Sequence, residues 1–361
     1  MSDYEIQKGL NLAPSEEEIT AVIEAARRDV RYLVTDYPVE LLVQKFKEEP
    51  EQEGDIYIPE YQRKLRWSEQ AQSYFIESVI LRIPVPPIFF YDVKGRLEIV
   101  DGSQRVRTLA RFVNNEFALG DLDKLDILSG FRYADFPLTV RKRLFNTPIR
   151  SFVLDEGTDE STRIELFRRL NTTGKTLHDA EIRKGAFRGR FLDLILECAA
   201  TDIFKQLSPK ITKAADPESE RQELVTRFFI YSDHYTEFKH DVRRFLDLNV
   251  IELNKTITDA QVHHMRDEFL RTMTFVTDNY PKAFYRGGKG GTLPRVRFEA
   301  VAVGTCLALR QKPNLKLTSD PDWIFGDQLN ALVRTDASNS GPRLRVRIEF
   351  VRDRLLAQSN D

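Results

Sequence analysis

Apolar residues in the first half of the chain recur with helical spacing in some segments and with strand spacing in others. Helical spacing, in which apolar residues lie three and four apart, covers residues 15–28, 39–48, 68–81 and 161–170. Strand patterns, short and either alternating or wholly apolar, cover residues 55–58, 87–91, 97–100 and 149–154. Because the two kinds of segment alternate, residues 1–185 are predicted to form a small lobe that combines helices with a sheet.

From residue 186 onward, almost every segment has helical spacing. The expected helices cover residues 187–199, 220–235, 242–253, 259–280, 295–309 and 343–356. A chain of 361 residues is long enough for two domains, since one domain usually holds roughly 100–200 residues. The sequence therefore predicts an α+β protein, in which a mostly α-helical domain at residues 186–361 follows the mixed lobe.

The composition is that of a globular protein without targeting segments. Hydrophobic residues make up 41% and charged residues 30% of the chain, which excludes a disordered protein. The formal net charge of -2 argues against a surface devoted entirely to nucleic acid, but leaves room for a local basic patch. The N-terminus has no basic-then-apolar signal pattern, and no window approaches the roughly 18 apolar residues that a membrane span needs. A cytoplasmic protein without a membrane partner is expected.

One junction between a strand and a helix has the features of an anion-binding turn. The apolar strand at 97–100 runs into Asp101-Gly102-Ser103-Gln104-Arg105, and helical spacing follows as far as residue 112. Free backbone N–H groups and the positive end of the helix dipole favour an anion at such a junction. Arg105 adds a charge that can hold phosphate through two parallel hydrogen bonds. Taken alone, however, such a segment is more often an ordinary structural turn.

Two further segments place polar side chains beside predicted elements. The upstream segment, from Ile58 to Trp67, contains Gln62 and Arg63, and the downstream segment holds Asn171 and Gly174 after a helix. By themselves these residues are typical of core and surface positions, because aromatic rings pack in cores and arginine pairs with carboxylates. We expect the strand that ends at residue 58 to lie beside the strand at 97–100. Gln62 and Arg63 would then line the same cleft as Arg105, because ligands collect at such strand ends.

Four blocks in a fixed order carry more information than any block alone. They are Ile58-Pro-x-Tyr61-Gln62-Arg63-x3-Trp67, Phe75-Ile-Glu77-Ser-Val-Ile80-Leu-x-Ile83-Pro84, Ile99-Val-Asp101-Gly102-Ser-Gln104-Arg105-x2-Thr108-Leu109 and Phe167-x3-Asn171-x2-Gly174-x2-Leu177. Together they resemble the DGQQR-motif domain, the N-terminal domain of GmrSD-like type IV restriction systems and related phage-defence proteins. The resemblance continues through Glu220-Arg221-x-Glu223-Leu-Val-x-Arg227 and His240-Asp241, and so covers roughly residues 35–255.

The resemblance implies a ParB/sulfiredoxin-like fold with a small mixed sheet for the first lobe. In this fold a short arginine-containing turn at a helix start holds nucleotide phosphates. Carried over by position, the nucleotide-binding residues are Gln62, Arg63, Gly102, Ser103, Gln104, Arg105, Asn171 and Gly174. The implied catalytic residues are Asp101, Arg105 and Arg63. The two arginines would neutralise charge on the phosphates, and Asp101 would orient water or hold Mg²⁺. Asp101 suits a helix N-cap equally well, so both roles stay open.

The implied function is binding and hydrolysis of a nucleoside triphosphate by a regulatory protein of a bacterial restriction or anti-phage system. The chain departs from the family pattern at Ser103, where glutamine is usual, and it shows no recognisable His-Asn-His nuclease segment. The alternative is a non-catalytic module that binds nucleotide or DNA and recruits an effector nuclease or another partner chain. Self-association into a homo-oligomer is compatible with either function.

Overall fold

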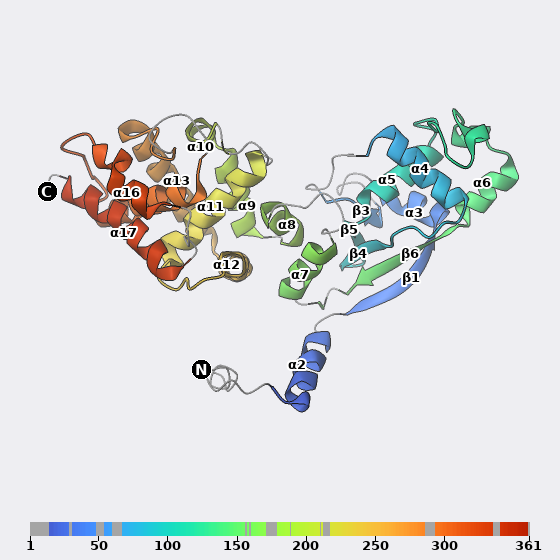
Figure 1. The fold of residues 1–361 in the computed structure, drawn as a ribbon, viewed down its shortest axis with the longest axis horizontal. Coiled ribbons are helices and arrows are strands. Elements are labelled where there is room, and N and C mark those ends of the chain that lie inside the picture. Colours follow the sequence, from blue (N-terminus) through green and yellow to red (C-terminus); the bar gives the residue numbers. More distant parts are fainter. Residues whose placement is uncertain are drawn as a thin grey trace. The chain divides into compact units, whose positions relative to one another are not determined.

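The chain divides into two compact units, Met1–Lys175 and Thr176–Asp361, and each is described by itself (Figure 1). The computed structural model describes residues 14–28, 31–47, 54–59, 67–155, 157–158, 160–170, 179–187, 189–209, 211, 217–285, 293–334 and 340–359. The boundary expected after residue 185 falls at the end of helix α8 (Asp179–Ala186), which belongs to the second unit.

The described part of the first unit contains one mixed sheet of six strands, in the order β1-β6-β4-β5-β3-β2. The strands are β1 (Tyr32–Pro38), β2 (Phe46–Lys47), β3 (Ile56–Tyr57), β4 (Ile88–Val93), β5 (Arg96–Asp101) and β6 (Pro148–Leu154). β4 and β5 are antiparallel, whereas β3 runs parallel to β5 and β6 runs parallel to β4. The predicted mixed sheet is confirmed.

The β4–β5 hairpin follows from its turn residues. Lys94 and Gly95 have φ values of 54° and 83°, as in the type I′ turn, whose twist suits two antiparallel strands. The N–H of Gly95 donates to Asp92 Oδ1 at 2.7 Å, which fixes the turn further. The hairpin brings Asp101, the last residue of β5, beside Phe89 of β4.

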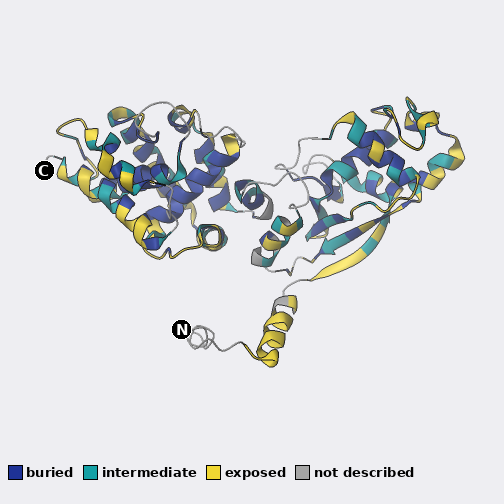
Figure 2. Cartoon of the chain, in the orientation of Figure 1, coloured by how far each residue is buried: buried dark blue, intermediate teal, exposed yellow. Residues whose placement is uncertain are grey.

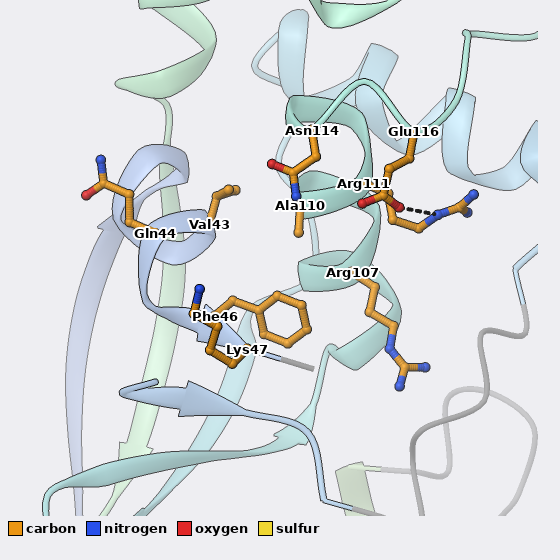
Figure 3. A pocket seen from close by; sticks show the side chains of 9 residues that line it. All are labelled: Val43, Gln44, Phe46, Lys47, Arg107, Ala110, Arg111, Asn114 and Glu116. Atoms are coloured by element: carbon orange, nitrogen blue, oxygen red, sulfur yellow. Dashed lines mark hydrogen bonds and ion pairs between the residues drawn. The ribbon is translucent and has the colours of Figure 1, made fainter. Parts of the chain in front are cut away.

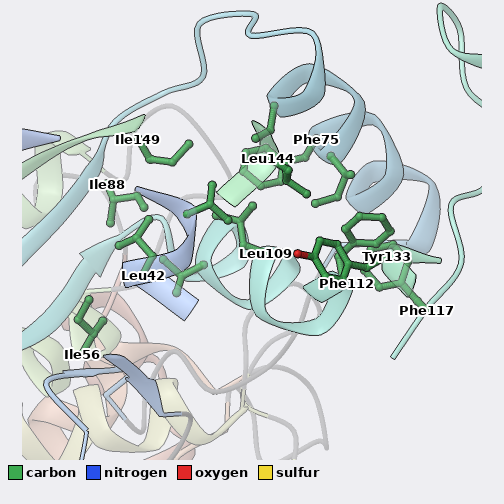
Figure 4. Packing of buried hydrophobic residues seen from close by; sticks show 14 of the residues in the cluster. Leu42, Ile56, Phe75, Ile88, Leu109, Phe112, Phe117, Tyr133, Leu144 and Ile149 are labelled. Atoms are coloured by element: carbon green, nitrogen blue, oxygen red, sulfur yellow. The ribbon is translucent and has the colours of Figure 1, made fainter. Parts of the chain in front are cut away.

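Three helices supply most of the helical side chains in the core of the first unit: α3 (Val39–Lys45), α4 (Glu69–Ile80) and α5 (Ser103–Val113). Leu109 and Phe112 of α5 lie in one buried cluster with Leu42 of α3 and Phe75 of α4 (Figure 4). Full burial of each such side chain contributes roughly 1.5–3 kcal/mol, so α5 is firmly fixed against the sheet. The remaining α-helices described in this unit are α2 (Glu16–Arg28), α6 (Leu138–Phe145) and α7 (Glu160–Leu170).

The described part of the second unit is almost entirely helical, as predicted. Its helices are α8, α9 (Arg190–Ala200), α10 (Asp202–Leu207), α11 (Pro217–His234), α12 (Val242–Thr256), α13 (Asp259–Asn279), α14 (Arg295–Phe298), α15 (Gly304–Gln311), α16 (Asp327–Leu332) and α17 (Gly341–Ala357). α11 is buried along most of its length (Figure 2). Within the core, the ring of Phe228 meets those of Phe229 and Phe269 at centroid distances of 5.4 and 5.2 Å.

The segment expected to form one helix at 295–309 departs from a regular α-helix. A π-helical turn, Glu299–Val303, separates α14 from α15. A Cβ atom on Gly304 would lie 2.7 Å from the carbonyl oxygen of Ile348, so glycine at this position lets α15 approach α17 closely. None of the helices in the described part of the chain has the length and apolar character required to cross a lipid bilayer.

Candidate functional site

The predicted anion-binding turn lies where β5 meets α5. Gly102 is the N-cap of α5 and has a φ of 100°, in the left-handed region that favours glycine. The N–H of Val106 donates to the carbonyl oxygen of Gly102 at 3.0 Å, which is the first hydrogen bond of the helix. The side chain of the N-cap residue is a single hydrogen atom, so it cannot cap α5. The N-terminal backbone amides and the positive end of the helix dipole are therefore not neutralised by an N-cap side chain.

The side chain of Arg105 is hydrogen-bonded to residues beside the turn and does not project freely from it. Its Nη2 donates to Asp101 Oδ2 at 2.6 Å and to the carbonyl oxygen of Pro87 at 3.0 Å. Only 11% of the side chain is exposed, and its Nε is buried without a hydrogen-bond partner among the described residues. Arg105 thus has a packing role that the sequence did not indicate, and its contact with phosphate stays a prediction. Buried arginine keeps hydrogen-bond partners, and here they are the last residue of β5 and the residue that precedes β4.

Asp101 does not cap the helix. The N-cap position belongs to Gly102, and the Asp101 carboxylate pairs instead with the guanidinium of Arg105. A third of the Asp101 side chain is exposed, at 33%, so the carboxylate is accessible from solvent. Of the two roles left open by the sequence, the N-cap is wrong, and the role toward water or Mg²⁺ stays a prediction. Among the described residues, no group of three or more His, Cys, Asp or Glu side chains is placed to hold a metal ion.

The upstream segment, from Ile58 to Trp67, has both of its ends near the junction of β5 and α5. β3 and β5 run side by side in the same direction, with Ile56 opposite Leu97, so both chains leave the sheet at one end. At the other end of the segment, the N–H of Trp67 donates to Gln104 Oε1 at 3.2 Å. The expected pairing of the two strands is confirmed. Gln62 and Arg63 lie outside the described residues, so their place in the cleft stays a prediction.

The remaining predicted positions are Asn171, Gly174 and Ser103. Asn171 and Gly174 lie outside the described residues, directly after α7, which contacts β5. Ser103, at the first position of α5, is largely buried, with 8% of the residue exposed. The substitution of serine for the usual glutamine is therefore at a position that is largely closed to solvent.

Replacing Gly102 with alanine tests whether the shape of the turn matters. A Cβ atom there would lie 3.0 Å from Arg105 Nη2 and 3.1 Å from Ile88 Cγ1, and the φ of +100° is strained for any L-residue. We expect the free energy of unfolding to fall by about 1–3 kcal/mol in chemical denaturation. Gly130→Ala is the matched control, because its φ is +85° but no described atom lies within 4 Å of its added Cβ. Equal losses in both variants would mean that contact with Arg105 is unimportant.

A pocket of ≈ 700 Å³ lies beside α5 (Figure 3). Helical spacing places Ser103 on the same face of α5 as Arg107, which lines the pocket. Its lining residues are Val43, Gln44, Phe46, Lys47, Arg107, Ala110, Arg111, Asn114 and Glu116. Three of them are basic and one is acidic. Arg111 is held in place by Gln72 Oε1 at 2.6 Å and Glu116 Oε2 at 3.3 Å. Sequence reasoning missed this pocket, although Arg107 and Arg111 stand one helical turn apart in α5 and could have indicated it.

The two motifs of the second unit converge on a separate pocket of ≈ 480 Å³. Asp179, Glu223, Arg227, His240, Asp241, Val242 and Arg243 line it. Behind it, Arg183 joins Glu223 to Asp247, with 2.8 Å from its Nε to Asp247 Oδ1. Arg227 in turn pairs with two carboxylates, which extends this chain of charges. Its Nε lies 2.9 Å from Glu223 Oε1, and its Nη1 lies 2.5 Å from Glu299 Oε1.

This chain of buried charges keeps Glu223 ionised. Burial alone would raise the pKa of Glu223, but the guanidinium groups of Arg183 and Arg227 outweigh burial and hold that pKa well below its ordinary value. Arg347 donates to Glu299 Oε2 at 2.5 Å and balances the far end of the chain. Each charge therefore has an opposite neighbour, which is the condition under which buried ions are tolerated.

Comparison with known families gives one match. Residues 40–188 match the family model described as the GmrSD restriction endonuclease, N-terminal domain. The match spans the four N-terminal sequence blocks and confirms the resemblance there, but it does not reach the two motifs of the second unit. Neither the curated proteins nor the solved structures contain a match to the chain.

Proposed function

Since residues 40–188 carry a GmrSD restriction endonuclease N-terminal domain, we propose that the first unit binds and hydrolyses a nucleoside triphosphate within a bacterial restriction or anti-phage system. The observation that carries this proposal is the N-terminus of α5, which has no side-chain N-cap and follows the left-handed Gly102. Such a helix start offers backbone N–H groups to an anion, and phosphate is the anion that these sites most commonly take.

The charges around the turn fit phosphate. Arg105 offsets the carboxylate of Asp101, so that no uncompensated negative group repels phosphate from the helix start. Because one oxygen of Asp101 is bound to Arg105 and the side chain is partly exposed, its other oxygen is available for Mg²⁺. Mg²⁺ is usually bound by one or two protein carboxylates together with substrate phosphates. The bound ion would reduce the negative charge on those phosphates.

The basic pocket beside α5 is suited to the remainder of the nucleotide. It begins one turn beyond Ser103, and it combines the ring of Phe46 with the charges of Lys47, Arg107 and Arg111. An aromatic ring can stack on a base, and the basic groups favour an anionic ligand. We propose that the phosphates lie at the helix start and that the nucleoside extends along this face.

A panel of nucleoside triphosphates, measured for binding and for phosphate release with and without duplex DNA, tests the proposal. We expect at least one nucleotide to bind and to release phosphate in the presence of Mg²⁺. Binding of none of the four common nucleotides would contradict the proposal. Binding without release would leave the domain as a sensor and remove the catalytic part of the proposal.

Ser103→Gln tests the position at which the chain leaves the family pattern. A serine hydroxyl can donate a hydrogen bond to phosphate but reaches about two bonds less far than a glutamine amide. We expect the substitution to raise the turnover number on the order of three- to tenfold, with little change in nucleotide affinity. An unchanged turnover in an active protein would show that position 103 is peripheral. Loss of binding would mean that the turn has adapted to the small, largely buried serine.

The second candidate is a non-catalytic module that binds DNA and recruits an effector nuclease or another partner chain. α6 favours it, because Lys142 and Arg143 in its last turn are exposed and could contact backbone phosphates. DNA affinity that falls steeply with salt, together with no phosphate release from any nucleotide, would support this function over the first.

A further inference from the structure

α2 exposes an apolar stripe that nothing in the described structure covers. Ile19, Val22 and Ile23 lie on one face of this 13-residue helix, and they are 46%, 68% and 47% exposed. The exposed residues of this helix are yellow in Figure 2. Helices of this length are marginally stable in water without packing of their apolar face. The stripe therefore requires an apolar partner.

The helix is well defined at its start. The N–H of Glu18 donates to Ser15 Oγ at 3.1 Å, and the N–H of Ser15 donates to Glu18 Oε2 at 2.8 Å. These two hydrogen bonds form a capping box at the start of the helix that the spacing of residues 15–28 predicted. The stripe is thus carried by a helix with a fixed first turn.

The charges at the two ends of α2 indicate what covers the stripe. The first turn holds Glu16, Glu17 and Glu18, whereas the helix ends in arginine. At 100° per residue, Glu16 and Arg27 flank the same edge of the stripe, and both are exposed. A partner helix running in the opposite direction with an identical sequence would bring its Arg27 to this Glu16, and its Glu16 to this Arg27.

We propose that α2 pairs antiparallel with α2 of a second copy of this chain. In this arrangement Val22 of each copy packs against Ile23 of the other, and the Glu16–Arg27 pair forms twice, as two-fold symmetry requires. A parallel pair would place Glu16 next to Glu18 of the other copy, where like charges repel. Because two such short helices bury less than the 1,200–2,000 Å² of a typical stable interface, dissociation constants on the order of micromolar are expected.

Charge-reversal variants of the full chain test the pairing by sedimentation velocity across a range of protein concentrations. We expect the wild type to dimerise, and Glu16→Lys or Arg27→Glu to weaken the dimer about tenfold or more, since each places like charges opposite one another twice. An equimolar mixture of the two variants should regain dimers. In the mixed dimer the lysine introduced at position 16 of one chain meets the glutamate introduced at position 27 of the other, and the unchanged Glu16 meets the unchanged Arg27. Glu24→Lys is the matched control, because residue 24 lies on the far side of the helix from the stripe.

Three results would overturn the proposal. The first is a wild type that stays monomeric at about 100-fold above the expected micromolar range, as it would if the stripe docked on its own chain. The second is a mixture of the two variants that stays monomeric. The third is a Glu24→Lys variant that weakens the dimer as much as Glu16→Lys does. Val22→Asp, which places a charge in the middle of the stripe, should abolish dimers, and dimers that survive it would equally contradict the pairing.

Discussion

Replacing Glu223 with glutamine is expected to lower the free energy of unfolding of the second unit by about 3–5 kcal/mol. Glu223 is the shared partner of Arg183 and Arg227, and all three side chains are buried, with exposures of 3%, 2% and 9%. A neutral amide of the same size would leave two buried guanidinium groups with one anionic partner fewer. The measurement is chemical denaturation followed by circular dichroism.

The dependence of this effect on pH gives an independent check. The pKa of Glu223 in the folded protein lies below its ordinary value of 4.5, so its ionisation stabilises the fold above about pH 4.5. That stabilisation is lost as the pH falls toward the lowered pKa. The difference in stability between wild type and Glu223→Gln should therefore shrink as the solution is acidified below about pH 4.5. Glu218→Gln, at an exposed position of the same helix, should change stability by less than about 0.5 kcal/mol at any pH. A Glu223→Gln variant as stable as this control would show that the buried charges contribute little.

Arg105→Ala is expected to weaken nucleotide binding by about 2–5 kcal/mol, which is about 30-fold or more in the dissociation constant. The reason is partly indirect. Without the guanidinium, the carboxylate of Asp101 would stand uncompensated beside the helix start and would repel phosphate. Loss of the hydrogen bonds from Arg105 to Asp101 and Pro87 should also lower stability by about 1–3 kcal/mol. Isothermal titration with the preferred nucleotide measures the first effect, and thermal denaturation measures the second.

Two companion variants separate binding from folding. Arg143→Ala removes an exposed arginine from the same unit and should leave both quantities unchanged. In the absence of Mg²⁺, Asp101→Asn combined with Arg105→Ala removes the repelling carboxylate and should recover part of the affinity lost in Arg105→Ala. Normal nucleotide binding by Arg105→Ala would show that phosphate binds elsewhere. Failure of that variant to fold would identify the junction as a structural turn.

The parts of the fold that depend on local sequence were predictable. The hairpin turn at Lys94 and Gly95 and the capping box at Ser15 each follow from a few neighbouring residues, whose conformations need no distant partner. The alternation of helical and strand spacing was enough to predict a lobe of helices and a sheet, whereas the mixed sheet was implied by the family resemblance. The position of β3 beside β5 was also inferred correctly, from the expectation that Gln62 and Arg63 lie at the same end of the sheet as Arg105. Their parallel direction was not predicted.

The parts that depend on long-range contacts were not predictable. The carbonyl oxygen of Pro87 engages Arg105 from 18 residues away, and no sequence spacing indicates it. The same is true of Glu299, which meets Arg227 across 72 residues. A local sequence pattern can therefore indicate a basic residue at the start of a helix. It cannot show whether that residue binds a ligand or stabilises the fold.

The π-helical turn at Glu299–Val303 makes the length of its helix unusually important. A π turn holds one residue more than an α turn, and it offsets the side chains that follow by about 100° from those that precede it. This offset allows Glu299 to meet Arg227 and Arg347 while Gly304, farther along the same helix, faces α17. Deleting one residue here would give a regular helix that hydrogen-bonds well but cannot satisfy both contacts at once. Related chains that lack the extra residue would need a different solution for the charges of Arg227 and Arg347, so the insertion and the ion chain should be gained or lost together during evolution.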